Sequence, residues 1–117
     1  MRLKTNLLLG LLCASPLGAG AQETLNMEQA MALMQQNMCL GCHQIDKRRV
    51  GPAFANIADR YGGTTERDAT INVLMNSIQN GGRGKWGAIP MPAQPQVTDE
   101  EARDMAAFIL TLQQKPE

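Results

Sequence analysis

The 117 residues carry eleven basic and eleven acidic side chains, so the net charge is zero and does not favour a nucleic-acid partner. A chain of this length supports one domain with a modest core, which excludes a multidomain protein. Only four residues are aromatic: two Phe, one Tyr and one Trp. Because aromatic side chains supply much of the volume of a protein core, the composition leaves room for a buried apolar cofactor.

The N-terminus has the three parts of a secretory signal peptide. Two positive charges in residues 1–6 precede an apolar run over residues 7–14, and small residues follow. The apolar run is too short to span a bilayer. We therefore expect cleavage after Ala21, which removes residues 1–21 as a signal peptide and leaves residues 22–117 as one periplasmic domain without a membrane span.

Three cysteines limit the possible disulfide chemistry. Cys13 lies within the apolar run, which leaves lipid attachment open as an alternative, although Leu12 stands where such sites usually have a small residue. Cleavage would remove Cys13. The remaining pair, Cys39 and Cys42, is too few for a framework of several disulfides, so their thiols are available for other chemistry.

Helical periodicity recurs along the mature chain, without a strand-like alternation or an internal repeat. A first helix is expected to start at Asn26, which forms a capping pair with Gln29. Its apolar residues follow the spacing of one buried face, comprising Met27, Ala30, Met31, Met34 and Met38. A short second helix over residues 53–61 would begin after Pro52 and stop at a pair of glycines.

Two further helices follow. Thr65 and Asp68 predict the start of the third, and Asn80-Gly81 predicts its end. Its expected apolar face is Ile71, Leu74, Met75 and Ile78. A capping box of Thr98 and Glu101 starts the fourth. Its buried stripe would be Ala102, Met105, Ala106, Ile109 and Leu110. The predicted fold class is all-α, with about four helices.

Cys39-Leu40-Gly41-Cys42-His43 is the attachment pattern of a c-type haem. Two thiols three residues apart can join the two vinyl groups, and the adjacent imidazole can ligate the iron. We therefore predict one haem c, bound covalently through Cys39 and Cys42, with His43 as an axial ligand.

Three other uses of this motif are chemically possible. A short-loop disulfide and a C-x-x-C redox dithiol would both leave His43 without a role, and such a dithiol normally belongs to a βαβ fold. A structural zinc needs four ligands, whereas the mature chain offers two cysteines and one histidine. Haem attachment explains all three side chains.

His43 is the only histidine in the sequence, which excludes an iron held by two histidines of the same chain. Methionine is then the usual second axial ligand. Met91 lies outside the predicted helices, in a loop over residues 81–97, and its neighbours Pro90 and Pro92 stiffen the backbone that presents it. We predict Met91 as the second ligand. The alternative is a loop methionine packed beside an open or differently ligated iron.

Together with C-x-x-C-H, four segments carry a resemblance to the small bacterial class I cytochromes c of the c-551 type. They are Val50-Gly51-Pro52, Asn80-Gly81, Lys85-Trp86-Gly87 and Ile89-Pro90-Met91-Pro92. Their order and spacing match that family over nearly the whole mature chain. The resemblance implies a class I cytochrome c fold, in which the helices wrap around one covalently bound haem.

The resemblance also implies roles for individual residues. The carbonyl of Pro52 would accept the N–H of the ligating imidazole, and the indole of Trp86 would donate to a haem propionate. Ser77 stands where relatives often have an arginine aimed at a propionate, so that charge is absent or supplied by Arg83. Gln94 replaces a common asparagine near the methionine sulfur, and a small insertion falls near residues 62–67.

A closed His/Met iron has no coordination site for a substrate, so we expect one-electron transfer rather than catalysis. The resemblance implies a periplasmic carrier that takes electrons from a quinol-oxidising complex or a copper protein. Its acceptor would be a denitrification nitrite reductase, a terminal oxidase or a peroxidase. A monomer is expected. The alternative is a haem enzyme, or a gas- or peroxide-responsive protein, in which Met91 dissociates.

Charged residues are unevenly distributed. Basic residues near the proposed haem edges are Lys47, Arg48, Arg49, Arg83 and Lys85, whereas Asp99, Glu100, Glu101 and Asp104 cluster near the C-terminus. Apolar residues expected at the exposed edge are Leu40, Val50, Ile89 and Ala93. The basic group could be a docking rim or ordinary solvated charge, and the sequence leaves both open.

Overall fold

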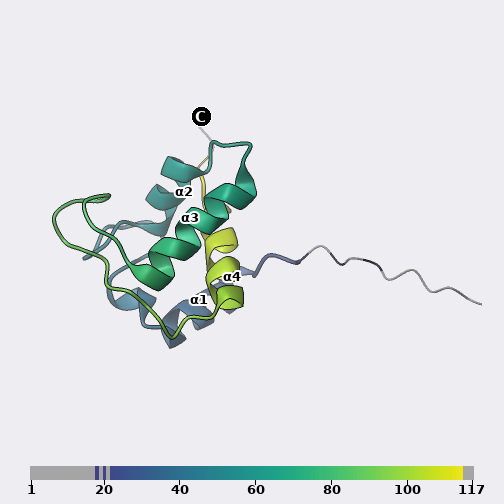
Figure 1. Ribbon diagram of the computed structural model, residues 1–117, viewed down its shortest axis with the longest axis horizontal. Helices are drawn as coiled ribbons and strands as arrows, with labels where there is room; N and C mark the ends of the chain where they lie inside the picture. The colour runs from purple at the N-terminus through teal and green to yellow at the C-terminus, as the bar shows by residue number, and fades with distance from the viewer. Residues whose placement is uncertain (1–17, 19, 21, 115–117) are drawn as a thin grey trace, which may run out of the picture.

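The computed structural model describes residues 18, 20 and 22–114, so almost all of the predicted signal peptide, Cys13 included, lies outside the described residues. The helices are α1 (Met27–Gln36), α2 (Phe54–Tyr61), α3 (Arg67–Asn80) and α4 (Asp99–Leu110), with a 3-10 turn, η1 (Cys39–Gly41), after α1 (Figure 1). Among these described residues, the β-type pairing is limited to one isolated antiparallel bridge between Gly82 and Met91. No helix among them is long and apolar enough to cross a membrane. The predicted all-α class is confirmed.

Helix α4 is the element against which the others pack, because it contacts α1, α2 and α3 (Figure 1). Its start is the predicted capping box: Thr98 Oγ1 accepts from the Glu101 N–H, and the Glu101 carboxylate accepts from the Thr98 N–H. All five predicted residues of its stripe are buried, and Phe108 joins them. Burial of each of the four large side chains, Met105, Phe108, Ile109 and Leu110, stabilises the fold by about 2 kcal/mol.

Helix α1 begins as predicted, with Asn26 and Gln29 in a reciprocal capping box. The prediction of a buried methionine face was partly wrong. Met34 is fully buried, but Met27 is 48% exposed and Met38 is 82% exposed. Met27 is the first residue of the helix, and the helix ends at Gln36, before the 3.6-residue period can carry Met38 back to the core.

Helix α3 also differs from the prediction at its start. Thr65 is not the cap: the N-cap is Glu66, whose N–H donates to Thr64 Oγ1. Thr70 Oγ1 in turn donates to the Glu66 carbonyl. The predicted end is confirmed, since Gly81 follows the helix with a φ of 73°, a conformation that glycine adopts without strain.

The cap of α4 gives a direct stability test. Replacing Thr98 with Ala removes the side-chain acceptor for the Glu101 N–H and should lower the free energy of unfolding by about 1 kcal/mol. Guanidinium denaturation of the haem-loaded protein measures the change. Thr65→Ala is the matched control, because Thr65 caps no helix, and it should change stability by less than about 0.5 kcal/mol. Equal losses from the two variants would contradict the assignment of caps.

Candidate functional site

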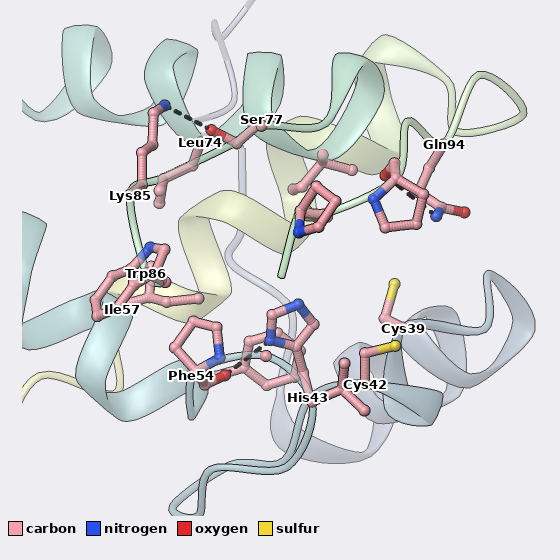
Figure 2. Close-up of a pocket in the computed structure, with 18 of the residues that line it drawn as sticks. Cys39, Cys42, His43, Phe54, Ile57, Leu74, Ser77, Lys85, Trp86 and Gln94 are labelled. Carbon is pink, nitrogen blue, oxygen red and sulfur yellow. Dashed lines mark hydrogen bonds between the residues drawn. The ribbon is translucent and has the colours of Figure 1, made fainter. Parts of the chain in front are cut away.

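The attachment segment is a tight turn that follows α1 directly. Met38 adopts a left-handed conformation with φ 63°, which reverses the chain at the end of the helix. The carbonyl of Cys39 then accepts from the N–H groups of Cys42 and His43, at 3.1 and 3.0 Å. These bonds bring both thiols and the imidazole to one central cavity, where Figure 2 shows the two sulfurs on the same side.

The imidazole of His43 is buried, with 8% of the residue exposed. Its Nδ1 lies 2.7 Å from the carbonyl oxygen of Pro52 (Figure 2). Because a carbonyl can only accept, Nδ1 carries the proton, and Nε2 is left unprotonated and able to bind a metal. The ring also stacks on Phe54, with centroids 5.1 Å apart and an interplanar angle of 19°.

Gly51 allows this arrangement. A Cβ at this position would lie 2.5 Å from His43 Cε1. The Gly51 N–H donates to the Cys42 carbonyl at 2.8 Å, and the Phe54 N–H donates to the Gln44 carbonyl at 2.9 Å. The segment before α2 therefore lies directly against the attachment turn.

Met91 also lines the central cavity, on the loop between α3 and α4. Gly82 and Met91 exchange both backbone hydrogen bonds, at 3.0 and 2.9 Å, and form the isolated bridge. A Cβ at Gly81 would collide with the Met91 carbonyl. The Gln94 N–H donates to the carbonyls of Ile78 and Gln79, so the loop is fastened to the end of α3 on both sides of Met91.

The cavity walls are mainly apolar and come from all four helices. Their buried residues are Met34, Phe54, Ile57, Leu74, Ile78, Met105 and Ile109. Arg83 and Lys85 are the cations among the described lining residues, which include no carboxylate. An apolar cavity with two thiols, one imidazole and a cationic edge fits a macrocycle that has an apolar face and acidic substituents.

Trp86 is half-buried in the cavity wall, and two arginines from other segments hold its backbone. Arg60 on α2 places its guanidinium 4.6 Å from the centroid of the indole and donates to the Lys85 carbonyl. Arg48 donates to the Trp86 carbonyl at 3.1 Å. The indole is therefore fixed from outside the cavity.

Burial raises the pKa of the Cys39 thiol. A catalytic dithiol works through a thiolate and usually has a lowered pKa. The environment of Cys39, within an all-α fold, therefore disfavours the dithiol interpretation of C-x-x-C.

The family model for cytochrome c matches residues 27–113. The chain belongs to the cytochrome c family. It is 41% identical over 80 residues to cytochrome c-552 of Hydrogenobacter thermophilus, covering 68% of this chain and 78% of that protein. It is 44% identical over 80 residues to cytochrome c-551 of Pseudomonas denitrificans, covering 68% and 93%.

The fold agrees with these relatives. The crystal structure of Nitrosomonas europaea cytochrome c552 superimposes with a TM-score of 0.65 at 38% identity, covering 71% of this chain and 99% of that one. The protein is thus a class I monohaem cytochrome of the c-551 type with one covalently bound haem c, whose attachment motif is present at Cys39 and Cys42. Cytochromes of this family are electron-transfer proteins rather than enzymes, and so is this one.

All six residues singled out from the sequence meet at the central cavity: Cys39, Cys42, His43, Pro52, Trp86 and Met91. Sequence reasoning missed Phe54 under the imidazole and Arg60 over the indole. It placed Lys85 near a haem edge but did not foresee its contact with Ser77. Phe54 could have been found from the sequence, since it lies two residues after Pro52. Arg60 had no local signal, because its contact with the indole depends on the loop between α3 and α4 returning to α2.

The contact between Gly51 and the imidazole predicts a position-specific cost. Gly51→Ala forces the ring or the backbone to move and should destabilise the haem-loaded protein by about 1–3 kcal/mol. Denaturant unfolding followed by haem absorbance measures it. The control is Gly63→Ala, where the added Cβ meets nothing within 4 Å. If the Gly51 variant were as stable as the control, the close packing against His43 would be disproved.

Proposed function

We propose that this cytochrome is a periplasmic one-electron carrier with His43 and Met91 as the axial ligands of its haem iron. Residues 1–21 act as a cleaved signal peptide, and residues 22–117 form the working domain as a monomer. Electrons come from a quinol-oxidising complex or a copper protein and pass to a nitrite reductase, a terminal oxidase or a peroxidase. The family's covalent haem supplies the ferric/ferrous couple.

The observation that carries the proposal is the hydrogen bond between His43 Nδ1 and the Pro52 carbonyl. It selects the tautomer with Nε2 available and raises the donor strength of the ring. Met91 supports the second position, since its loop is braced by paired bonds to Gly82 and borders the same cavity. A thioether ligand favours ferrous iron and a high potential, and two protein ligands leave no site for a substrate.

Replacing Met91 tests the ligation. Wild-type ferric protein should show the weak far-red band of a sulfur–iron bond, and the ferrous protein should not bind carbon monoxide. Met91→Ala should lose the band and bind carbon monoxide. Met75→Ala is the control, because Met75 is a half-buried methionine outside the described cavity lining. A wild-type protein that binds carbon monoxide readily would instead favour a ligand-responsive haem protein.

Docking would use the exposed side of the attachment turn and the Met91 loop. Val50 and Ile89 are 42% and 63% exposed and border the central cavity. Arg83 is an exposed residue of the same cavity lining, and Lys47, Arg48 and Arg49 are exposed on the segment directly before Val50. An apolar centre with a basic rim suits a small, transient contact with an acidic partner surface.

This rim predicts salt-sensitive electron transfer. The second-order rate constant with a purified periplasmic nitrite reductase should fall as ionic strength rises, because salt screens the attraction. Arg83→Gln should slow the reaction several-fold at low salt. Arg103→Gln removes the same charge from α4, away from the described cavity lining, and should have little effect. Rates independent of salt, or equal effects of the two variants, would refute the basic rim.

A further inference from the structure

Lys85 and Ser77 form a solvent-exposed polar contact in the mainly apolar wall of the central cavity. Lys85 Nζ donates to Ser77 Oγ at 3.3 Å, which links the loop after α3 to α3 itself (Figure 2). Figure 2 shows this pair and Trp86 on one side of the cavity and the cysteines on the other.

Lys85 and Ser77 lie across the cavity from the cysteines, where the structure of haem c predicts its propionates. The thioether bonds join the macrocycle at its vinyl-derived carbons, and the two propionates extend from the opposite edge. In a haem attached at Cys39 and Cys42, the carboxylates would therefore face the side that holds Lys85, Ser77 and Trp86.

The hydrogen bonds of Ser77 define which group would meet a carboxylate. Its hydroxyl donates to the Val73 carbonyl at 3.1 Å and accepts from Lys85. Its one proton is therefore already used, so Ser77 orients the ammonium instead of donating to a ligand. An ammonium has three N–H donors, and two of those on Lys85 remain for an anion.

The backbone that carries Lys85 is fixed from outside the cavity. Arg60 donates to the Lys85 carbonyl, and Arg48 donates to the carbonyl of Trp86. A lysine on an anchored backbone, with its ammonium held by Ser77, loses less side-chain freedom when it binds a ligand.

We propose that Lys85, positioned by Ser77, binds a propionate carboxylate of the haem and keeps it ionised. The cavity lining among the described residues offers no acidic side chain to compete for the ammonium. The other side chains near this edge are the cations Arg48, Arg60 and Arg83 and the phenol of Tyr61. Every charged side chain among them therefore favours the ionised carboxylate.

The consequence concerns the reduction potential. An ionised propionate stabilises ferric iron, so its protonation raises the potential. In the wild type the carboxylate stays ionised through the neutral range, and the potential should be flat. Without Lys85, the pKa of the carboxylate should rise, because an attractive positive charge is lost, and the potential should fall as pH increases through this higher pKa.

The experiment measures the midpoint potential of haem-loaded protein between about pH 5 and pH 8. Lys85→Gln should introduce the pH-dependent fall, Lys85→Arg should restore a flat profile, and Ser77→Ala should give a smaller effect than Lys85→Gln. Arg103→Gln is the control, since it removes one positive charge from α4, outside the described cavity lining and outside the basic rim.

Identical potential profiles for Lys85→Gln and Arg103→Gln would overturn the proposal, as would a flat profile for Lys85→Gln. The far-red band is recorded in the same samples. Its absence from the wild type would refute the axial ligation by Met91, whereas the potential profiles alone decide the role of Lys85, so the two failures are distinguishable.

Discussion

The hydrogen bond between His43 Nδ1 and the Pro52 carbonyl ties together two parts of the chain on which the cavity depends. On one side is the attachment turn after α1, and on the other is the start of α2. The bond requires the segment before α2 to approach the imidazole so closely that residue 51 must lack a side chain. The hydrogen bond fixes the tautomer of the imidazole, and stacking on Phe54, at an interplanar angle of 19°, covers one face of the ring.

The cavity wall that carries Met91 is formed differently, because it belongs to the long loop between α3 and α4 and not to a helix. A long loop can present a side chain reproducibly only if its backbone is anchored. Here the bridge between Gly82 and Met91 and the bonds from Gln94 to the end of α3 provide the anchors. Arg48 and Arg60 anchor the middle of the same loop at the carbonyls of Trp86 and Lys85. The loop thus contributes three side chains to the cavity lining: the thioether of Met91, the indole of Trp86 and the ammonium of Lys85.

Most of the fold could be predicted from local sequence. The capping boxes at Asn26 and Thr98 are confirmed because each bond spans only three residues. Predictions were wrong where a nearby alternative competed: Glu66 took the cap position expected for Thr65, and the early end of α1 left Met38 exposed. Helix ends depend on small differences between competing backbone hydrogen bonds, which a periodic pattern does not resolve.

The sequence by itself determined the cofactor and its attachment, because C-x-x-C-H contains both thiols and the imidazole within five adjacent residues. It also singled out Met91, through its neighbouring prolines and its place outside the helices. Only the tertiary structure decided what surrounds these groups: Phe54 beneath the imidazole, Arg60 over the indole and Lys85 against Ser77. Those contacts join segments that are distant in sequence. Their geometry depends on how α2, α3 and the long loop pack together, and no local spacing encodes that packing.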